Sequence, residues 1–69
     1  EDQEIASLIS AFLRRQSPES RVIFLRRYWY ADTVEETAGH LGWSLSRTKS
    51  VLFRTRKKLK AYLEQEGML

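Results

Sequence analysis

The sequence predicts an all-α fold, a small bundle of four helices, and three observations lead to this prediction. Apolar residues recur at spacings of three and four along most of the 69-residue chain, which is the period of a helix with one buried face. Residues that begin or end helices divide this pattern into four segments. The alternation of apolar and polar residues that is typical of a strand is absent from the sequence.

The first two helices are marked by an apolar stripe and by a helix start signal. The stripe of the first helix consists of Ile5, Leu8, Ile9, Phe12 and Leu13. The second helix begins after Ser17, a favourable N-cap residue, with Pro18 at the first helical position. It should end near residues 30–32, and its inward side chains should be Val22, Ile23, Leu25, Tyr28 and Trp29.

The last two helices have the clearest boundaries. Thr33 and Glu36 form the pattern of a capping box, which opens a short helix that Gly42 ends with left-handed backbone. Ser44 then caps a long helix that runs to about Glu64, with Thr48, Val51 or Leu52, Leu59 and Leu63 facing inward. A short helix, a tight turn and a second helix predict a helix-turn-helix over about residues 33–64.

The net charge of +3 is small, but the basic residues are concentrated in one segment. Residues 44–62 contain seven Lys or Arg and no acid, whereas residues 1–43 and 63–69 each carry a net charge of −2. A basic segment of this kind is typical of a protein that binds a polyanion, and it is also found on solvated helix faces.

The composition excludes several classes of protein. With no Cys and one His, the chain has no disulfide, no thiol nucleophile and no multi-ligand zinc site. We therefore expect no enzyme, no cofactor and no metal. No apolar run approaches the ~20 residues of a bilayer span, so we expect a cytoplasmic protein that binds no membrane. The chain begins at Glu1, which favours one domain, residues 1–69, cut from a longer protein.

The fourth helix has the composition of a DNA recognition helix. Such a helix enters the major groove by its N-terminal end, where small polar and basic side chains reach base edges. Ser46, Arg47, Lys49 and Ser50 meet this requirement, and Arg54, Arg56, Lys57 and Lys58 follow where the helix would pass phosphates. The helix starts at Thr33 and Ser44 could also turn amides toward phosphates, or act only as caps.

The remaining aromatic and titratable residues have ordinary structural interpretations. Tyr28, Trp29 and Trp43 lie beside turns on apolar faces, which favours packing over base stacking. Phe53 is either a core residue or an apolar contact to a thymine methyl group. His40 is expected at the surface or at a helix end, and spacing along the sequence places no acid–base partner beside it.

Several segments together resemble region 4 of bacterial sigma factors, most closely the extracytoplasmic-function group. They are residues 17–29, Thr33–Ala38, Leu41–Ser44 and Lys49–Leu59. The last is the most specific, since it follows the family signature VKSxLxRxRxxL. The resemblance implies a monomer that reads the −35 element of double-stranded promoter DNA through the major groove. It also implies that an apolar surface docks on the flap of the RNA polymerase β subunit, with an anti-sigma factor as a further partner.

The same resemblance assigns roles to individual residues by position. Lys49, Ser50, Phe53 and Arg54 match base contacts and nearby backbone contacts of the family. The N-terminal contacts are matched by Ser46 and Arg47, and basic positions near phosphate by Arg56 and Lys57.

Two inward positions depart from the family pattern. Thr37 stands where the family usually has Ile, and Thr48 where it usually has Val. Buried hydroxyls in so small a core should cost on the order of 1–2 kcal/mol each. A hydrogen bond back to the preceding turn would reduce that cost.

Two other classes of function are compatible with these residues. One is a LuxR-like or phage-type helix-turn-helix regulator, although LuxR-like proteins normally read DNA as dimers. The other is a protein-only interaction module, which would use the stripe on the first helix to bind polymerase or an anti-sigma factor.

Overall fold

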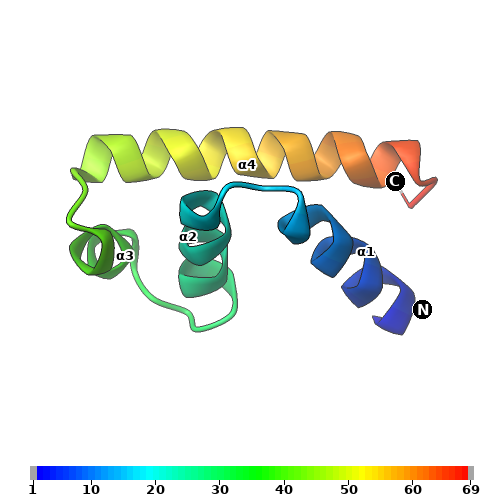
Figure 1. The fold of residues 1–69 in the computed structure, drawn as a ribbon, viewed down its shortest axis with the longest axis horizontal. Helices are drawn as coiled ribbons and strands as arrows, with labels where there is room; N and C mark the ends of the chain where they lie inside the picture. The colour runs from blue at the N-terminus through cyan, green and yellow to red at the C-terminus, as the bar shows by residue number, and fades with distance from the viewer. Residues whose placement is uncertain (1, 69) are drawn as a thin grey trace.

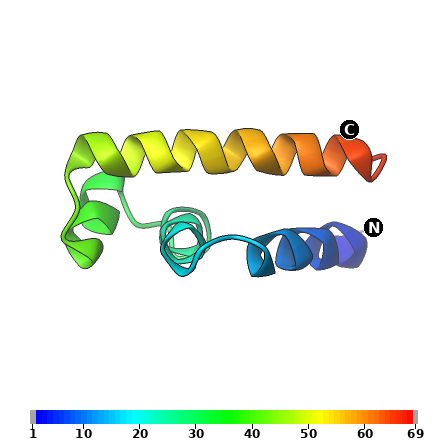
Figure 2. The ribbon, with the colours of Figure 1, turned by 45° about the horizontal axis from the view of Figure 1, so that its top comes forward.

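The computed structural model describes residues 2–68 and contains four helices. They are α1 (Asp2–Arg14), α2 (Pro18–Tyr28), α3 (Val34–Leu41) and α4 (Leu45–Gln65). The described residues form no strand, and the all-α prediction is confirmed. The long helix α4 runs the length of the molecule, and the other three helices lie along one side of it (Figure 1, Figure 2). Each of them packs against α4, and α2 also packs against α3.

Side chains close to the predicted boundaries fix three helix starts. The hydroxyl of Ser17 accepts a hydrogen bond from the Ser20 amide at 3.2 Å. The capping box is complete, since Thr33 Oγ1 accepts from the Glu36 amide at 3.0 Å and Glu36 Oε1 accepts from the Thr33 amide at 2.8 Å. The hydroxyl of Ser44 accepts from the Arg47 amide at 3.1 Å. These contacts confirm the predicted N-caps.

The turn between α3 and α4 also has its predicted form. Gly42 has a φ of 67°, the left-handed conformation that ends α3. A β-carbon here would be strained by this backbone conformation, even though no atom stands in its way. The helix-turn-helix therefore occupies the predicted residues.

The core combines apolar side chains with three threonines. The buried apolar residues are Phe12, Leu13, Ile23, Ala38 and Leu52. Thr37, Thr48 and Thr55 are also buried, and each hydroxyl donates to the carbonyl one turn earlier, at 2.9, 2.9 and 2.8 Å respectively. The expected hydrogen bonds of Thr37 and Thr48 are confirmed, so the buried hydroxyls are satisfied.

Three residues that were expected to face inward from α2 are exposed instead. Val22 is 41%, Tyr28 42% and Trp29 78% exposed. Ile23 is the residue that α2 buries completely, and the adjacent Val22 lies about 100° away around the helix. Although α2 ends at Tyr28, slightly before the expected 30–32, Trp29 keeps helical backbone as the C-cap, and its amide donates to the Leu25 carbonyl. It therefore lies about 120° around the helix from the buried Ile23 and faces outward.

The predicted stripe on α1 is covered only at its C-terminal end. Phe12 packs against Tyr62 of α4 with ring centroids 5.7 Å apart, whereas Ile5 is 40% exposed. Figure 1 shows α1 slanting away from α4 toward its N-terminus. The N-terminal half of the stripe therefore remains open on the surface.

Candidate nucleic-acid interface

The N-terminal half of α4 has one buried and one exposed face. The buried face consists of Thr48, Leu52 and Thr55, at spacings of four and three. All eight predicted contact residues on this helix are exposed, namely Ser46, Arg47, Lys49, Ser50, Phe53, Arg54, Arg56 and Lys57. Because the intervening residues hold the helix against the rest of the molecule, the predicted set faces solvent as a whole.

One line of residues lies opposite the buried face. We call it the outer strip; its members, at helical spacings of four, three and four, are Ser46, Ser50, Phe53 and Lys57. Phe53 is 55% exposed, so the core interpretation of this residue is wrong. The ammonium of Lys57 lies 5.5 Å from the centroid of the Phe53 ring, a cation–π contact that holds the two side chains together. The strip thus offers hydroxyls, an apolar ring and a cation.

A second line of basic residues flanks the outer strip on the side of α2's first turn. Arg47, Arg54 and Lys58 line a shallow polar pocket of about 270 Å³. Its opposite wall comes from Ser17 and Ser20 at the start of α2, together with Glu19, whose carboxylate offsets part of the positive charge. Sequence reasoning missed the contribution of α2, because only the packing of α2 on α4 brings these segments together.

Trp43 sets the direction of Arg47 at the entry to α4. The Arg47 guanidinium lies 3.7 Å from the centroid of the Trp43 ring, a close cation–π stack. Trp43 is half-buried in the turn before α4. Its packing position agrees with the sequence interpretation, and it holds Arg47 at the edge of the polar pocket.

The opposite flank of the outer strip carries Lys49 and Arg56, which are two turns apart. A guanidinium nitrogen of Arg56 donates to the hydroxyl of Tyr28, at the end of α2. Arg56 is therefore partly committed to a contact within the molecule, whereas Lys49 projects freely into solvent in the described structure.

Thr33 lies apart from the other predicted residues, at the first turn of α3. Its hydroxyl and its amide both bond to Glu36, and its carbonyl accepts from the Thr37 hydroxyl. Donation from the Thr33 amide to the Glu36 carboxylate lowers the pKa of Glu36, and the Thr33 side chain lowers it further. A phosphate at this helix start would meet an amide that is already occupied.

An apolar groove of about 720 Å³ lies between α1 and α2. Ile5, Ile9 and Leu13 line it from α1, and Phe24, Leu25 and the aromatic residues 28–30 line it from α2 and the following turn. None of its lining residues belongs to α4. The groove is thus a second exposed surface, separate from the basic one.

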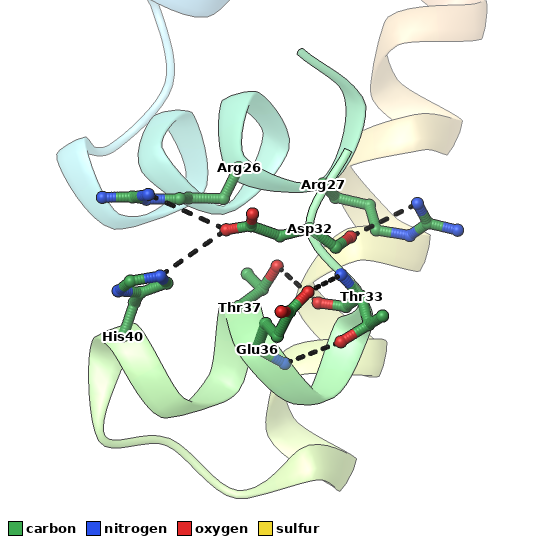
Figure 3. Close-up of polar contacts among 7 residues, drawn as sticks. All are labelled: Arg26, Arg27, Asp32, Thr33, Glu36, Thr37 and His40. Atoms are coloured by element: carbon green, nitrogen blue, oxygen red, sulfur yellow. Dashed lines mark hydrogen bonds and ion pairs between the residues drawn. The ribbon is translucent and has the colours of Figure 1, made fainter. Parts of the chain in front are cut away.

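A polar cluster joins α2 to α3 and includes His40, which is exposed in the last turn of α3 as expected. His40 Nε2 lies 3.7 Å from Asp32 Oδ2, an acid partner that the spacing along the sequence did not indicate (Figure 3). The same oxygen lies 3.8 Å from Arg26 Nη1. Helical spacing could not predict this contact, because Asp32 belongs to the linker that returns from α2 to α3.

The described residues form neither a metal-binding cluster nor a membrane-spanning helix. Over the part of the chain that the structure describes, no three His, Cys, Asp or Glu residues gather closely enough to hold a metal ion. None of the described helices combines the length and the apolar character that crossing a bilayer requires.

The chain is similar to known proteins over most of its length. The family model described as Sigma-70, region 4 matches residues 13–61. An RNA polymerase sigma-E factor from Streptomyces avermitilis is 32% identical over 62 residues, which cover 90% of this chain and 35% of that protein. The chain thus spans about a third of the length of this curated relative. No solved structure matches the chain significantly.

Proposed function

The chain belongs to the sigma-70 region 4 family, and on this premise we propose that it is the DNA-binding module of a sigma factor. In this proposal the N-terminal half of α4 enters the major groove of the −35 element of a promoter. The module thereby positions RNA polymerase for transcription initiation, and it performs no chemistry of its own. The proposed setting is the cytoplasm, with the module acting as a monomer.

The observation that carries the proposal is the exposed basic face of α4. The family match covers all nine predicted contact residues, and the eight on α4 are exposed in a segment without a single acid. An α-helix fits the major groove, and its most outward residues meet the base edges. The outer strip would therefore lie along the bases, with Phe53 against a thymine methyl group.

The two flanks of the strip would meet the sugar–phosphate backbones. On one side Arg47, Arg54 and Lys58 form a row of cations, and on the other side lie Lys49 and Arg56. Contacts to phosphates supply affinity and register, whereas contacts to bases supply sequence preference. Lys49, near the N-terminal end of α4, is the residue of this set best placed to reach a base edge as well.

We also propose that the apolar groove between α1 and α2 docks on RNA polymerase, at the flap of the β subunit. Trp29 and Tyr30 are 78% and 64% exposed beside this groove. A concave surface rimmed by exposed aromatic residues is typical of a protein-binding site. An anti-sigma factor that bound the same groove would compete with polymerase.

The test of DNA reading is a binding selection against a randomised duplex pool at low salt, followed by sequencing. Enrichment of one short asymmetric motif is the expected result. A palindromic motif would instead indicate a dimeric regulator. If no motif is enriched while circular dichroism shows a folded protein, the DNA assignment of the isolated chain is wrong, and a pull-down with the β flap decides whether it is a protein-binding module.

A matched pair of variants sharpens this selection. Lys49→Ala removes a cation beside the outer strip, and Lys60→Ala removes an equally exposed cation about three turns further along α4. The first variant should change or weaken the selected motif. The second should leave the motif unchanged, because its charge lies beyond the part of α4 that enters the groove.

A further inference from the structure

Asp32 lies between α2 and α3 and contacts both helices (Figure 3). Its amide donates to the Arg26 carbonyl at 2.9 Å, and Arg27 Nη1 donates to its carbonyl at 3.5 Å. Its carboxylate approaches Arg26 Nη1 at 3.8 Å and His40 Nε2 at 3.7 Å. His40 belongs to the last turn of α3, so this one side chain joins α2 to the C-terminal end of α3.

The carboxylate oxygen that faces Arg26 and His40 is under-satisfied. Asp32 Oδ2 is buried and accepts no hydrogen bond from any described residue. A buried acceptor without a donor costs free energy, and the cost is larger when the acceptor carries charge. Arg26 carries its charge at every pH of interest, but its distance is too long for a hydrogen bond. The oxygen therefore lacks a hydrogen-bond donor.

Protonated His40 is the group that can supply this donor together with a second positive charge. Histidine side chains change their charge between pH 5 and 8. The charged groups around His40 are Asp32 from the linker, Arg26 from α2 across the same oxygen, and Glu36 one turn earlier on α3. The Glu36 carboxylate already accepts from the Thr33 amide. No ion pair reaches this cluster from α4 within residues 2–68.

The position of this contact gives it consequences for α4. The capping box fixes the N-terminal end of α3, and its C-terminal end leads through Gly42 directly to Ser44, where α4 is capped. A cation at the end of α3 is also favoured by the helix dipole. A contact that holds the end of α3 against α2 therefore also restrains the start of α4, where the proposed base contacts lie.

We propose that Asp32 is a positioning residue through which protonation of His40 locks α3 against α2 and strengthens DNA binding by α4. The DNA half of this statement rests on the proposed function. The lock is closed when His40 is protonated and open when it is neutral. The Asp32 carboxylate supplies the buried acceptor that the protonated ring approaches.

The experiment compares thermal unfolding of the 69-residue chain at pH 6 and pH 8, at constant ionic strength, in the wild type and three variants. The wild type should unfold about 2–4 °C higher at pH 6, as expected for a partly buried ion pair in a small domain. Asp32→Asn and His40→Gln should both lose this difference. Glu35→Gln should keep it, because it removes an equal charge from an exposed residue that makes no side-chain hydrogen bond or ion pair within the described chain.

Asp32→Asn is the decisive variant, because it keeps His40 and nearly the same shape. If protonation of His40 acted only through its overall charge, Asp32→Asn would show the same pH dependence as the wild type, and the proposal would be wrong. A further variant, His40→Lys, carries a positive charge at both pH values. At pH 8 this variant should be as stable as the wild type is at pH 6. If at pH 8 it is no more stable than His40→Gln, the lock is contradicted.

Fluorescence anisotropy with the selected duplex tests the effect on DNA. The ratio of the wild-type affinity to the Asp32→Asn affinity should be about twofold larger at pH 6 than at pH 8. Equal ratios at the two pH values would overturn the link to DNA binding. A wild type that binds no duplex at either pH would overturn the proposed function, whereas the unfolding profiles would still decide whether Asp32 and His40 are coupled.

Discussion

The three buried threonines show how this chain accommodates polar groups in a very small core. Thr37 and Thr48 each lie four residues after an N-cap, and each hydroxyl donates to the carbonyl of that N-cap residue. The same carbonyls also accept the helical amides of Thr37 and Thr48, at 2.9 and 3.1 Å. Each carbonyl therefore keeps a hydrogen bond from a backbone amide even without the hydroxyl. The buried hydroxyls, in contrast, have no other partner among the described hydrogen bonds.

Thr48→Val should consequently stabilise the protein. The substitution keeps the shape of the side chain, removes a buried hydroxyl and leaves the Ser44 carbonyl bonded to the backbone amide of residue 48. We expect the free energy of unfolding to rise by about 0.5–1 kcal/mol, measured by urea denaturation. Thr48→Ala is the control, and it should destabilise because it leaves a cavity. A Thr48→Val variant less stable than the wild type would show that the hydrogen bond of the Thr48 hydroxyl contributes net stability.

Lys49 and Lys58 should differ in how they affect DNA binding. Lys49→Ala should weaken binding to the selected site by about 1–3 kcal/mol and reduce the preference over random duplex, because a base contact is lost. Lys58 lies on the flank with Arg47 and Arg54, so Lys58→Ala should weaken binding to both duplexes alike. The slope of log affinity against log salt concentration should become shallower by about one unit, since one phosphate contact is lost. Anisotropy titrations on both duplexes decide this, and equal losses for Lys49→Ala on the two would remove its base-reading role.

At the scale of the helices, local chemistry accounts for what the sequence could predict. Ser17, Thr33 and Ser44 act on amides only three residues away, and Gly42 acts on its own backbone. Such signals lie within one turn, so they are visible in the sequence. The outward direction of Trp29 was not predictable in this way, because it depends on which face of α2 packs against the rest of the molecule, and Ile23 is the residue buried there.

The capping box of α3 predicts a loss of stability in acid. Because the pKa of Glu36 is lowered in the folded protein, its ionised form contributes stability at every pH above the ordinary Glu range of about 4.3. That contribution disappears as the pH falls through the lowered value. An NMR titration should therefore place the midpoint of the Glu36 carboxyl below the ordinary Glu value. As the pH is lowered into the acid range, the unfolding temperature should fall less steeply in Glu36→Gln than in Glu35→Gln. An equal fall in the two variants would contradict the contribution of the Glu36 carboxylate to the capping box.

At the scale of the whole molecule, packing rather than periodicity creates the two surfaces. That the eight predicted contact residues on α4 share one exposed side of a helix could be predicted from the sequence, because helical spacing is regular. The polar pocket beside them and the apolar groove could not, since each joins residues from two helices that only the tertiary fold brings together. The contact between Arg56 and Tyr28 joins the two surfaces, as Tyr28 lines the groove and Arg56 flanks the outer strip.

Because the groove contains no residue of α4, polymerase and DNA should bind the module independently. Trp29→Ala removes the most exposed aromatic side chain of the groove, which is 78% exposed. It should change the free energy of unfolding by less than about 0.5 kcal/mol and leave DNA affinity unchanged. Binding to a β-flap fragment should fall by about 2 kcal/mol, as is typical of a tryptophan that an interface buries.

Lys49→Ala is the reciprocal variant, and it should lower DNA binding while leaving binding to the flap unchanged. Titration of the flap fragment with and without saturating duplex measures the coupling directly, and the two affinities should agree within about twofold. A larger difference would mean that the Arg56–Tyr28 contact transmits occupancy between the surfaces. Tyr28→Phe, which removes only the hydroxyl that accepts from Arg56, should then abolish that difference.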